Sequence, residues 1–256
     1  MDFSEKELQA KTKDLNDLHN DESYPAMLNA VSEWKDAFAG ETSQESVMGR
    51  QYHRRKFLLG MGATIAGGAV LAACGTSSSS SSSAVAPTTT IPTSLEVDLK
   101  VAALSASLEN LGVYAYTAGI SAATAGKLGA VPPAVVSFAQ TAMAQHKEHA
   151  AAWNSILVSA NRPRVVSTDA SLTPTVNAMF AKVTDASGLA ALALEIEGIA
   201  AATYLSGLSV VSSAKAISTA AAIQPVEMQH IAILNYVLGQ YPVPTAFGTT
   251  TLAAKA

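Results

Sequence analysis

The stretch Val226-Glu227-Met228-Gln229-His230-Ile231 places an acid and an imidazole three positions apart in an apolar segment. In an α-helix this spacing puts both side chains on one face. The chain as a whole is poor in charge, since only 14% of its residues are charged. An apolar helix has little reason to carry an unpaired acid, so Glu227 and His230 indicate a site.

Three other segments carry matching residues. Glu109 is followed seven residues later by Tyr116, and Glu197 is followed seven residues later by Tyr204. Seven residues make two helical turns, so each pair shares a helix face. The stretch His146-Lys147-Glu148-His149 sets two imidazoles three residues apart. In chain order the four segments therefore carry one glutamate, a pair of histidines, one glutamate, and a glutamate–histidine pair.

Apolar residues recur at helical spacing through the same four segments. The predicted helices run over about 95–127, from about 133 to before 161, over about 189–211 and over about 213–238. A short helix is expected over 174–183, and Pro225 is expected to kink the last long helix or break it in two. Strand signals are weak. The sequence therefore predicts an all-α fold, an antiparallel four-helix bundle over residues 95–240, followed by a tail over 241–256.

Such a bundle can hold two metal ions when two helices each donate one Glu and two helices each donate a Glu-x-x-His pair. Carboxylates offset the charge of the cations, whereas buried acids without a partner are costly. The candidate ligands are Glu109, His146, His149, Glu197, Glu227 and His230, which include every histidine after Cys74. The alternative is that these polar side chains lie on solvated faces of the helices.

On these residues, the segment from about 95 to 252 resembles the ferritin-like superfamily, which includes ferritins, rubrerythrin-like proteins and manganese catalases. The resemblance implies two metal ions, iron or manganese. It also implies that Tyr116 and Tyr204 lie behind the ligands. One position departs from the family pattern, because His146 stands where a Glu is expected. This side of the centre therefore has either a His ligand in place of a carboxylate or only five ligands in all.

The resemblance implies a redox protein that oxidises ferrous iron or removes peroxide, with no catalytic residue assigned beyond the ligands. The alternative is a non-enzymatic envelope or scaffold protein that keeps the bundle without the redox chemistry. Metal storage is a third reading. The net charge of -4 gives no basic surface that would predict nucleic acid as a partner. A homodimer is among the expected forms.

Residues 51–74 have the pattern of an export signal. Arg54 and Arg55 precede the uncharged stretch 57–73, which ends in Leu71-Ala72-Ala73-Cys74. A positive flank, a short apolar core and small residues at its end are typical of such signals. The pattern resembles a twin-arginine signal with a lipobox, whose cysteine is lipidated after cleavage. An uncleaved transmembrane anchor is the alternative. Both predict an exported, membrane-attached bundle, on the outer face of the cytoplasmic membrane or in the periplasm.

Two further segments flank this signal. Residues 75–94 include seven consecutive serines, Ser77 to Ser83, and are expected to form a flexible tether. Residues 1–50 are dense in charge. They are either a cytoplasmic extension or the result of a translation start assigned too early, with Met48 as the alternative first residue. No fold is predicted for them. The single cysteine, Cys74, excludes a disulfide within the chain.

Overall fold

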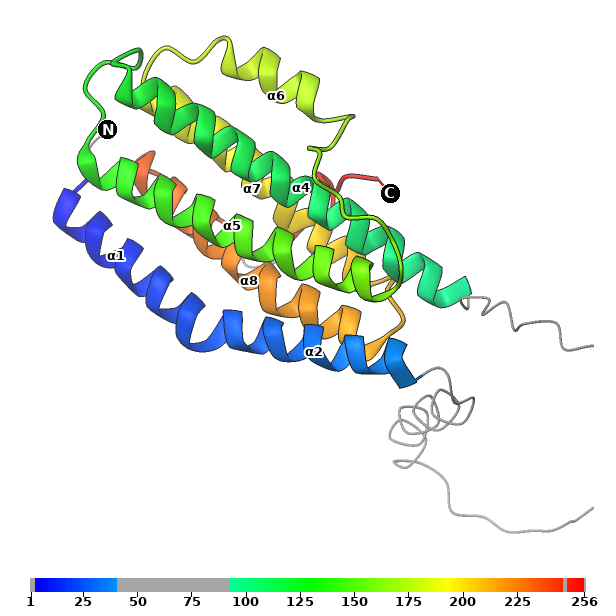
Figure 1. Ribbon diagram of the computed structural model, residues 1–256. Coiled ribbons are helices and arrows are strands. Elements are labelled where there is room, and N and C mark those ends of the chain that lie inside the picture. Colours follow the sequence, from blue (N-terminus) through cyan, green and yellow to red (C-terminus); the bar gives the residue numbers. More distant parts are fainter. Residues whose placement is uncertain (1–2, 41–92, 246–247, 256) are drawn as a thin grey trace, which may run out of the picture. The chain divides into compact units, whose positions relative to one another are not determined.

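The computed structural model describes residues 3–40, 93–245 and 248–255. Every regular element in these ranges is helical, and they contain no strand. The four long helices of the bundle (Figure 1) are α4 (Thr93–Thr124), α5 (Pro133–Ser159), α7 (Ala186–Leu208) and α8 (Ala214–Val237). The predicted all-α bundle is confirmed. Arg54, Arg55, Cys74 and the stretch 57–73 lie outside the described residues.

The ends of the bundle helices follow from local sequence. Asp185 caps α7 by accepting a 2.7 Å hydrogen bond from the backbone N–H of Gly188. Ser213 caps α8 in the same way through the backbone N–H of Ala216, at 3.0 Å. Gly239 follows α8 with a φ of +72°, a left-handed conformation that glycine adopts without strain.

The four helices form two hairpins, α4 with α5 and α7 with α8 (Figure 1). A long crossover leads from α5 to α7 and contains the short helix α6 (Thr173–Phe180), which packs on α7. Asn154 of α5 holds the crossover by donating to the carbonyl of Val165 at 3.0 Å and accepting from its N–H at 2.7 Å. Asn110 of α4 donates to the same carbonyl at 3.0 Å. The crossover is thereby fixed to the first hairpin.

Helix α8 runs through Pro225 as one element. Of the two outcomes predicted for Pro225, a kink or a break, the break into two helices does not occur, although proline removes one backbone donor. Ile223 and Val226, on either side of the proline, are at most 1% exposed, so packing holds the helix together. This continuity keeps Glu227 and His230 at helical spacing on one face.

Helix α7 is long and apolar enough to cross a membrane, judged by length and composition alone. Half of its most apolar window is buried inside the protein, and the helix carries Glu197, which is fully buried. Both features are those of a core helix in a bundle.

The N-terminal segment, for which the sequence predicted no fold, forms a further helical layer. α1 (Glu5–Leu18) continues through a π-helical turn, η1 (His19–Ser23), into α2 (Tyr24–Gly40). Figure 1 shows this layer running along α5 and α8. Met1–Phe38 and Pro92–Ala256 form one compact unit, so the layer belongs to the same folded body as the bundle.

The N-terminal layer docks through one face. Its buried residues recur at helical spacing: Leu8, Thr12 and Leu15 in α1, His19 in η1, and Met27, Ala30, Val31 and Trp34 in α2. Leu8 and Leu15 share a hydrophobic cluster with Phe138 of α5 and Val226 of α8. Burying a leucine side chain contributes about 1.5–3 kcal/mol, which favours this docking.

Candidate metal centre

Six polar side chains from four helices meet in the middle of the bundle. They are Glu109 of α4, His146 and His149 of α5, Glu197 of α7, and Glu227 and His230 of α8. Each is at most 1% exposed. The alternative of solvated helix faces is therefore excluded, and three acids lie in the core of a protein that has few charged residues.

Glu227 lies between two imidazoles. Its Oε1 is 3.1 Å from His149 Nδ1, and its Oε2 is 3.5 Å from His230 Nδ1. Each imidazole also faces a second carboxylate: His149 Nδ1 is 3.5 Å from Glu109, and His230 Nδ1 is 3.3 Å from Glu197. Each oxygen of Glu227 thus faces a separate His–Glu pair.

His146 takes a similar place between Glu109 and Glu197. Its Nδ1 is 2.6 Å from Glu109 Oε2, and its Nε2 is 3.2 Å from Glu197 Oε1. The ring packs against Gly112 of α4, where an added Cβ would lie 3.0 Å from three of the ring atoms. The missing side chain of Gly112 therefore makes room for an imidazole where the sequence pattern expects an acid.

The potential ligand atoms form two overlapping groups, each with its atoms within 4.8 Å of one another. The first consists of Glu109, His146, His149 and Glu227, and the second of His146, Glu197, Glu227 and His230. His146 and Glu227 belong to both groups. Carboxylate oxygens and imidazole nitrogens are the ligands that iron, manganese and zinc accept, so the cluster is compatible with metal binding.

The unpaired atoms of the cluster test whether a metal fits. The buried atoms without a hydrogen-bond partner in the described part of the chain include His149 Nδ1, Glu197 Oε2, both oxygens of Glu227, and His230 Nδ1. They lie at ion-pair distances from one another, but their geometry is not that of hydrogen bonds. Unpaired buried polar atoms are costly. A cation among them would satisfy all of these atoms, so the residues present fit a metal.

Two tyrosines reach across the bundle to the acids. Tyr116 of α4 donates to Glu197 Oε1 at 2.5 Å, and Tyr204 of α7 donates to Glu109 Oε1. Trp153 Nε1 donates to the Tyr204 hydroxyl at 2.8 Å. Burial, reinforced by the nearby acids, raises the pKa of both tyrosines well above the ordinary value, so both remain protonated donors. The two helices thus exchange partners: the tyrosine of α4 holds the glutamate of α7, and the tyrosine of α7 holds the glutamate of α4.

Opposing effects set the charge of the imidazoles. Burial alone would lower the pKa of His146, but the charges of Glu197 and Glu227 raise it well above the ordinary value. Burial likewise opposes the charged form of His149, but the nearby carboxylates of Glu109 and Glu227 raise the pKa to about 9. Both imidazoles therefore favour the protonated form in the metal-free protein.

The remaining groups follow the same pattern. Burial would lower the pKa of His230, but the charge of Glu197 raises it. Burial would raise the pKa of Glu109, but the charge of His149 and the hydrogen bond from His146 lower it to about 2. The pKa of Glu197 is well below its ordinary value because His230 and His146 outweigh its burial. Without metal, the cluster therefore balances carboxylates against imidazolium ions.

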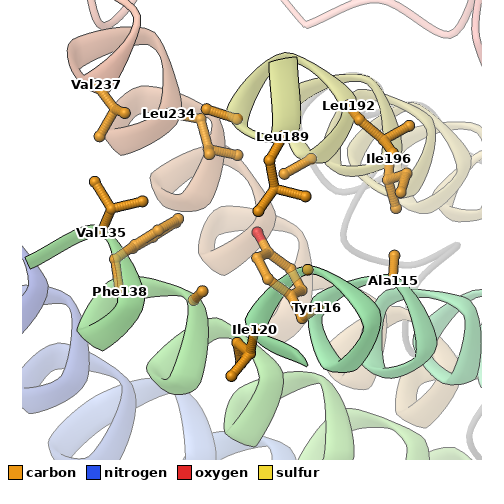
Figure 2. A pocket seen from close by; sticks show the side chains of 14 residues that line it. Ala115, Tyr116, Ile120, Val135, Phe138, Leu189, Leu192, Ile196, Leu234 and Val237 are labelled. Carbon is orange, nitrogen blue, oxygen red and sulfur yellow. The ribbon is translucent and has the colours of Figure 1, made fainter. Parts of the chain in front are cut away.

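An apolar pocket of about 40 Å³ adjoins the cluster at Tyr116. Figure 2 shows the Tyr116 ring in its wall, with Leu189 above the ring and Phe138 and Leu234 beside it. Its lining is apolar, and it is large enough to hold a very small molecule. The pocket thus leaves free space next to the ring whose hydroxyl holds Glu197.

The family comparison agrees with this geometry. A family model described as a ferritin-like domain matches residues 97–240, which is more than half of the chain and includes all six candidate ligands. The chain belongs to the ferritin-like family. Neither a curated protein nor a solved structure matches it significantly. The ferritin-like domain is thus the part that holds the cluster, and the roles of the six residues as ligands stay predictions.

Two residues that contact the histidines of the ferritin-like domain were not predicted. Gln145 lies 2.8 Å, Oε1 to Nε2, from His230. His19, which lies outside the family match, has its ring centre 5.4 Å from that of His149 and its Nε2 2.7 Å from Glu148 Oε2. Glu148 belongs to neither ligand group.

Weak sequence signals existed for both residues. Gln145 directly precedes His146 in a helix that was already predicted. His19 continues the apolar spacing of Leu8 and Leu15, which is visible in the sequence but does not say where the helix docks.

Proposed function

We propose that this ferritin-like domain binds two metal ions, iron or manganese, through Glu109, His146, His149, Glu197, Glu227 and His230. The observation that carries the proposal is the placement of Glu227. Its two oxygens face His149 and His230 separately, and neither oxygen has a hydrogen bond from the described residues. A ligand set of carboxylates with imidazoles suits iron and manganese.

Charge balance favours a centre that also accepts a small anion. Because His146 stands where a fourth acid is expected, only three carboxylates face the proposed cations. Two divalent ions would leave one positive charge uncompensated in a buried site, which is unfavourable. A singly charged anion, hydroxide or hydroperoxide, would compensate it. When bound, iron or manganese would supply the electron transfer for oxidising ferrous iron, with dioxygen or peroxide as the electron acceptor, or for removing peroxide.

The protein's own residues hold and shield the proposed centre. Tyr116 and Tyr204 fix one oxygen each of Glu197 and Glu109, which leaves the other oxygens to face the cations. Phe138, at 2% exposure, packs edge-on against His230, with ring centres 6.2 Å apart, and keeps water from that side. These contacts favour one fixed geometry of the ligands.

The test is metal analysis of the full-length protein, combined with assays of ferrous oxidation and peroxide removal. The proposal expects about two metal ions per chain in the wild-type protein and a loss of metal in Glu197→Gln. The matched control is Glu195→Gln, two residues away on the exposed face of the same helix, which should keep both metals. A wild-type protein with only trace metal and no activity would contradict the proposal.

We also propose that the folded domain is exported and tethered to a membrane, through a lipid on Cys74 or through an uncleaved segment 57–73. Cleavage before Cys74 would remove α1 and α2, and a span over 57–73 would separate them from the bundle, so the docked N-terminal layer belongs to the full-length chain before export. The sequence supports this by the order of Arg54, Arg55, the uncharged stretch and the lipobox-like Leu71-Ala72-Ala73-Cys74. Mass spectrometry of the protein from cell membranes should find an N-terminal, lipid-modified Cys74, or the intact chain if the segment stays as an anchor. Recovery of the unmodified chain from the soluble cytoplasmic fraction would contradict the proposal.

A second candidate function is a non-enzymatic envelope scaffold. The observation that favours it is the charge balance of the metal-free cluster, in which imidazolium ions face the buried acids and no cation is needed to neutralise them. This candidate expects Glu109→Ala and Glu227→Ala to leave the cellular phenotype unchanged as long as the bundle still folds.

A further inference from the structure

His149 and His230 hold equivalent positions in the two hairpins, but their outer nitrogens differ. His230 directs Nδ1 toward Glu197, and its Nε2 lies 2.8 Å from the side-chain oxygen of Gln145. His149 directs Nδ1 toward Glu227 in the same manner. Its Nε2, however, is buried without a hydrogen-bond partner among the residues described.

The equivalent position on α8 explains this difference. Gln145 lies four residues before His149 on α5 and reaches across to His230. The residue four positions before His230 on α8 is Val226, which is fully buried and has no polar side-chain atom. The second hairpin therefore cannot return the hydrogen bond that the first one provides. Of the two histidines, only His149 therefore lacks a hydrogen bond from the residues that the structure describes on Nε2, the nitrogen that points away from the carboxylates.

The N-terminal layer brings a third imidazole to this place. His19 is 1% exposed, and its ring meets that of His149 edge-on, at 61° between planes and 5.4 Å between centres. Its Nε2 is 2.7 Å from an oxygen of Glu148, the residue next to His149 in the chain. Its Nδ1 has no hydrogen-bond partner in the described ranges. His19 Nδ1 and the outer nitrogen of His149, Nε2, thus both lack a hydrogen-bond partner among the described residues, which is costly unless the two rings are linked.

The local structure fixes His19 in this position. It lies on the buried face of Leu8, Thr12 and Leu15, one turn beyond Leu15. It is also the first residue of η1, a π-helical turn that closes with the N–H of Tyr24 on the carbonyl of His19. Such turns occur mostly inside α-helices and often at functional sites.

We propose that His19 is a positioning residue for His149, supplying the outer hydrogen bond, direct or through one water molecule, that Val226 cannot. Glu148 fixes the ring of His19, and His19 fixes the ring of His149. A metal-bound imidazole is commonly oriented by such a partner on its second nitrogen. The inference rests on the metal binding proposed above. It assigns a role in the centre of the full-length chain, before any cleavage at Cys74, to a segment outside the ferritin-like match.

The test compares full-length His19→Leu with full-length Gln145→Leu. Both are loaded with isotopically enriched ferrous iron and measured by Mössbauer spectroscopy and by metal titration. His19→Leu should change the signal of one iron and weaken its binding about 10–100-fold, the usual effect of losing an outer partner. Gln145→Leu should change the signal of the other iron. Two variants that alter both irons equally, or neither, would overturn the proposal.

A conservative variant and a neighbouring variant separate positioning from folding. His19→Gln keeps a hydrogen-bonding side chain and should restore most of the affinity that His19→Leu loses. Thr12→Val keeps the docking face, because the Thr12 hydroxyl bonds only the carbonyl of Leu8 in its own helix, and should behave like the wild type. Loss of affinity in Thr12→Val, or none recovered by His19→Gln, would assign His19 a purely structural role and overturn the proposal.

A metal-free measurement keeps this inference separate from the proposed function. Nitrogen NMR of isotope-labelled histidine reports the hydrogen bonding of each ring nitrogen without metal. His19→Leu should shift the Nε2 resonance of His149, whereas Thr12→Val should not. An unchanged Nε2 resonance in His19→Leu would overturn the inference, whether or not iron binds. A wild-type protein that fails to bind iron would instead contradict the proposed function alone.

Discussion

The hydroxyl of Tyr116 donates a 2.5 Å hydrogen bond to Glu197, which lies on a different helix. Both residues are buried, at 7% and 0% exposure. The bond ties α4 to α7 and holds Oε1 of the acid, while Oε2 is left without a hydrogen bond from the described residues. Tyr116 therefore links the packing of the bundle to the orientation of a candidate ligand.

Replacing Tyr116 with phenylalanine should destabilise the metal-free protein by about 1.5–3 kcal/mol, because a buried charged acceptor loses the shorter of its two hydrogen bonds. Urea unfolding measures the change. The control is Tyr114→Phe, since Tyr114 is 42% exposed and bonds Asn177 at the surface. That variant should stay within about 0.5 kcal/mol of the wild type. An equal loss of unfolding free energy in the two variants would show that the bond to Glu197 stabilises the protein no more than a surface hydrogen bond does.

Gly112 and Gly119 lie seven residues apart on one face of α4 and provide a matched pair of alanine substitutions. An added Cβ at Gly112 would press on His146, which is held between two acids. Gly112→Ala should therefore displace His146 and weaken metal binding about 10–100-fold, as loss of a ligand's support does. Isothermal titration calorimetry with ferrous iron or manganese measures this change in affinity.

At Gly119, the added Cβ would lie 2.9 Å from the end of the Leu189 side chain. Leu189 borders the apolar pocket beside Tyr116 and can move into it (Figure 2). Gly119→Ala should therefore keep metal affinity and gain up to about 1 kcal/mol of helix stability. The same loss of metal in both alanine variants would refute the role given to Gly112.

The stability of the metal-free protein should fall as pH rises from about 6.5 to about 9. The folded protein raises the pKa of His149 from 6.5 to about 9, so its stabilising charge is fully present below 6.5 and lost as the pH passes 9. Glu109, with its pKa lowered from 4.5 to about 2, adds stability above 4.5 and loses it as the pH falls through 2. Thermal melting with a chelator present should show a maximum between about 4.5 and 6.5. A melting temperature that rises between 6.5 and 9 would contradict the charge assignment.

Metal binding should show the opposite dependence on pH. A cation requires the unprotonated imidazole of His149, so metal affinity should increase with pH up to about 9. Binding should also release protons, which titration calorimetry detects in buffers with different heats of ionisation. Affinity that stays constant between pH 6.5 and 9, without proton release, would place the metal elsewhere.

The helices of the bundle could be predicted from sequence because their signals are local. The last helix was predicted over about 213–238 and runs over Ala214–Val237, since Ser213 caps it and Gly239 follows it. The convergence of the six polar residues could also be expected, because each lies on the apolar face of its helix and a bundle turns those faces inward.

Other features depend on tertiary contacts that periodicity does not encode. Tyr116 and Tyr204 were placed on the correct helix faces. That each tyrosine bonds the glutamate of the other helix depends on how α4 lies against α7. Pro225 suggested a break that packing around Val226 prevents. His19 could not be connected to the centre, because spacing identifies the buried face of α1 but not the helices that cover it.

Anomalous diffraction from crystals of the full-length protein grown with manganese or ferrous iron tests the central claim most directly. Two peaks should lie within the cluster, one near His149 and Glu109 and the other near His230 and Glu197, with the carboxylate of Glu227 between them. Absence of peaks at saturating metal, or peaks only on surface residues, would contradict the account.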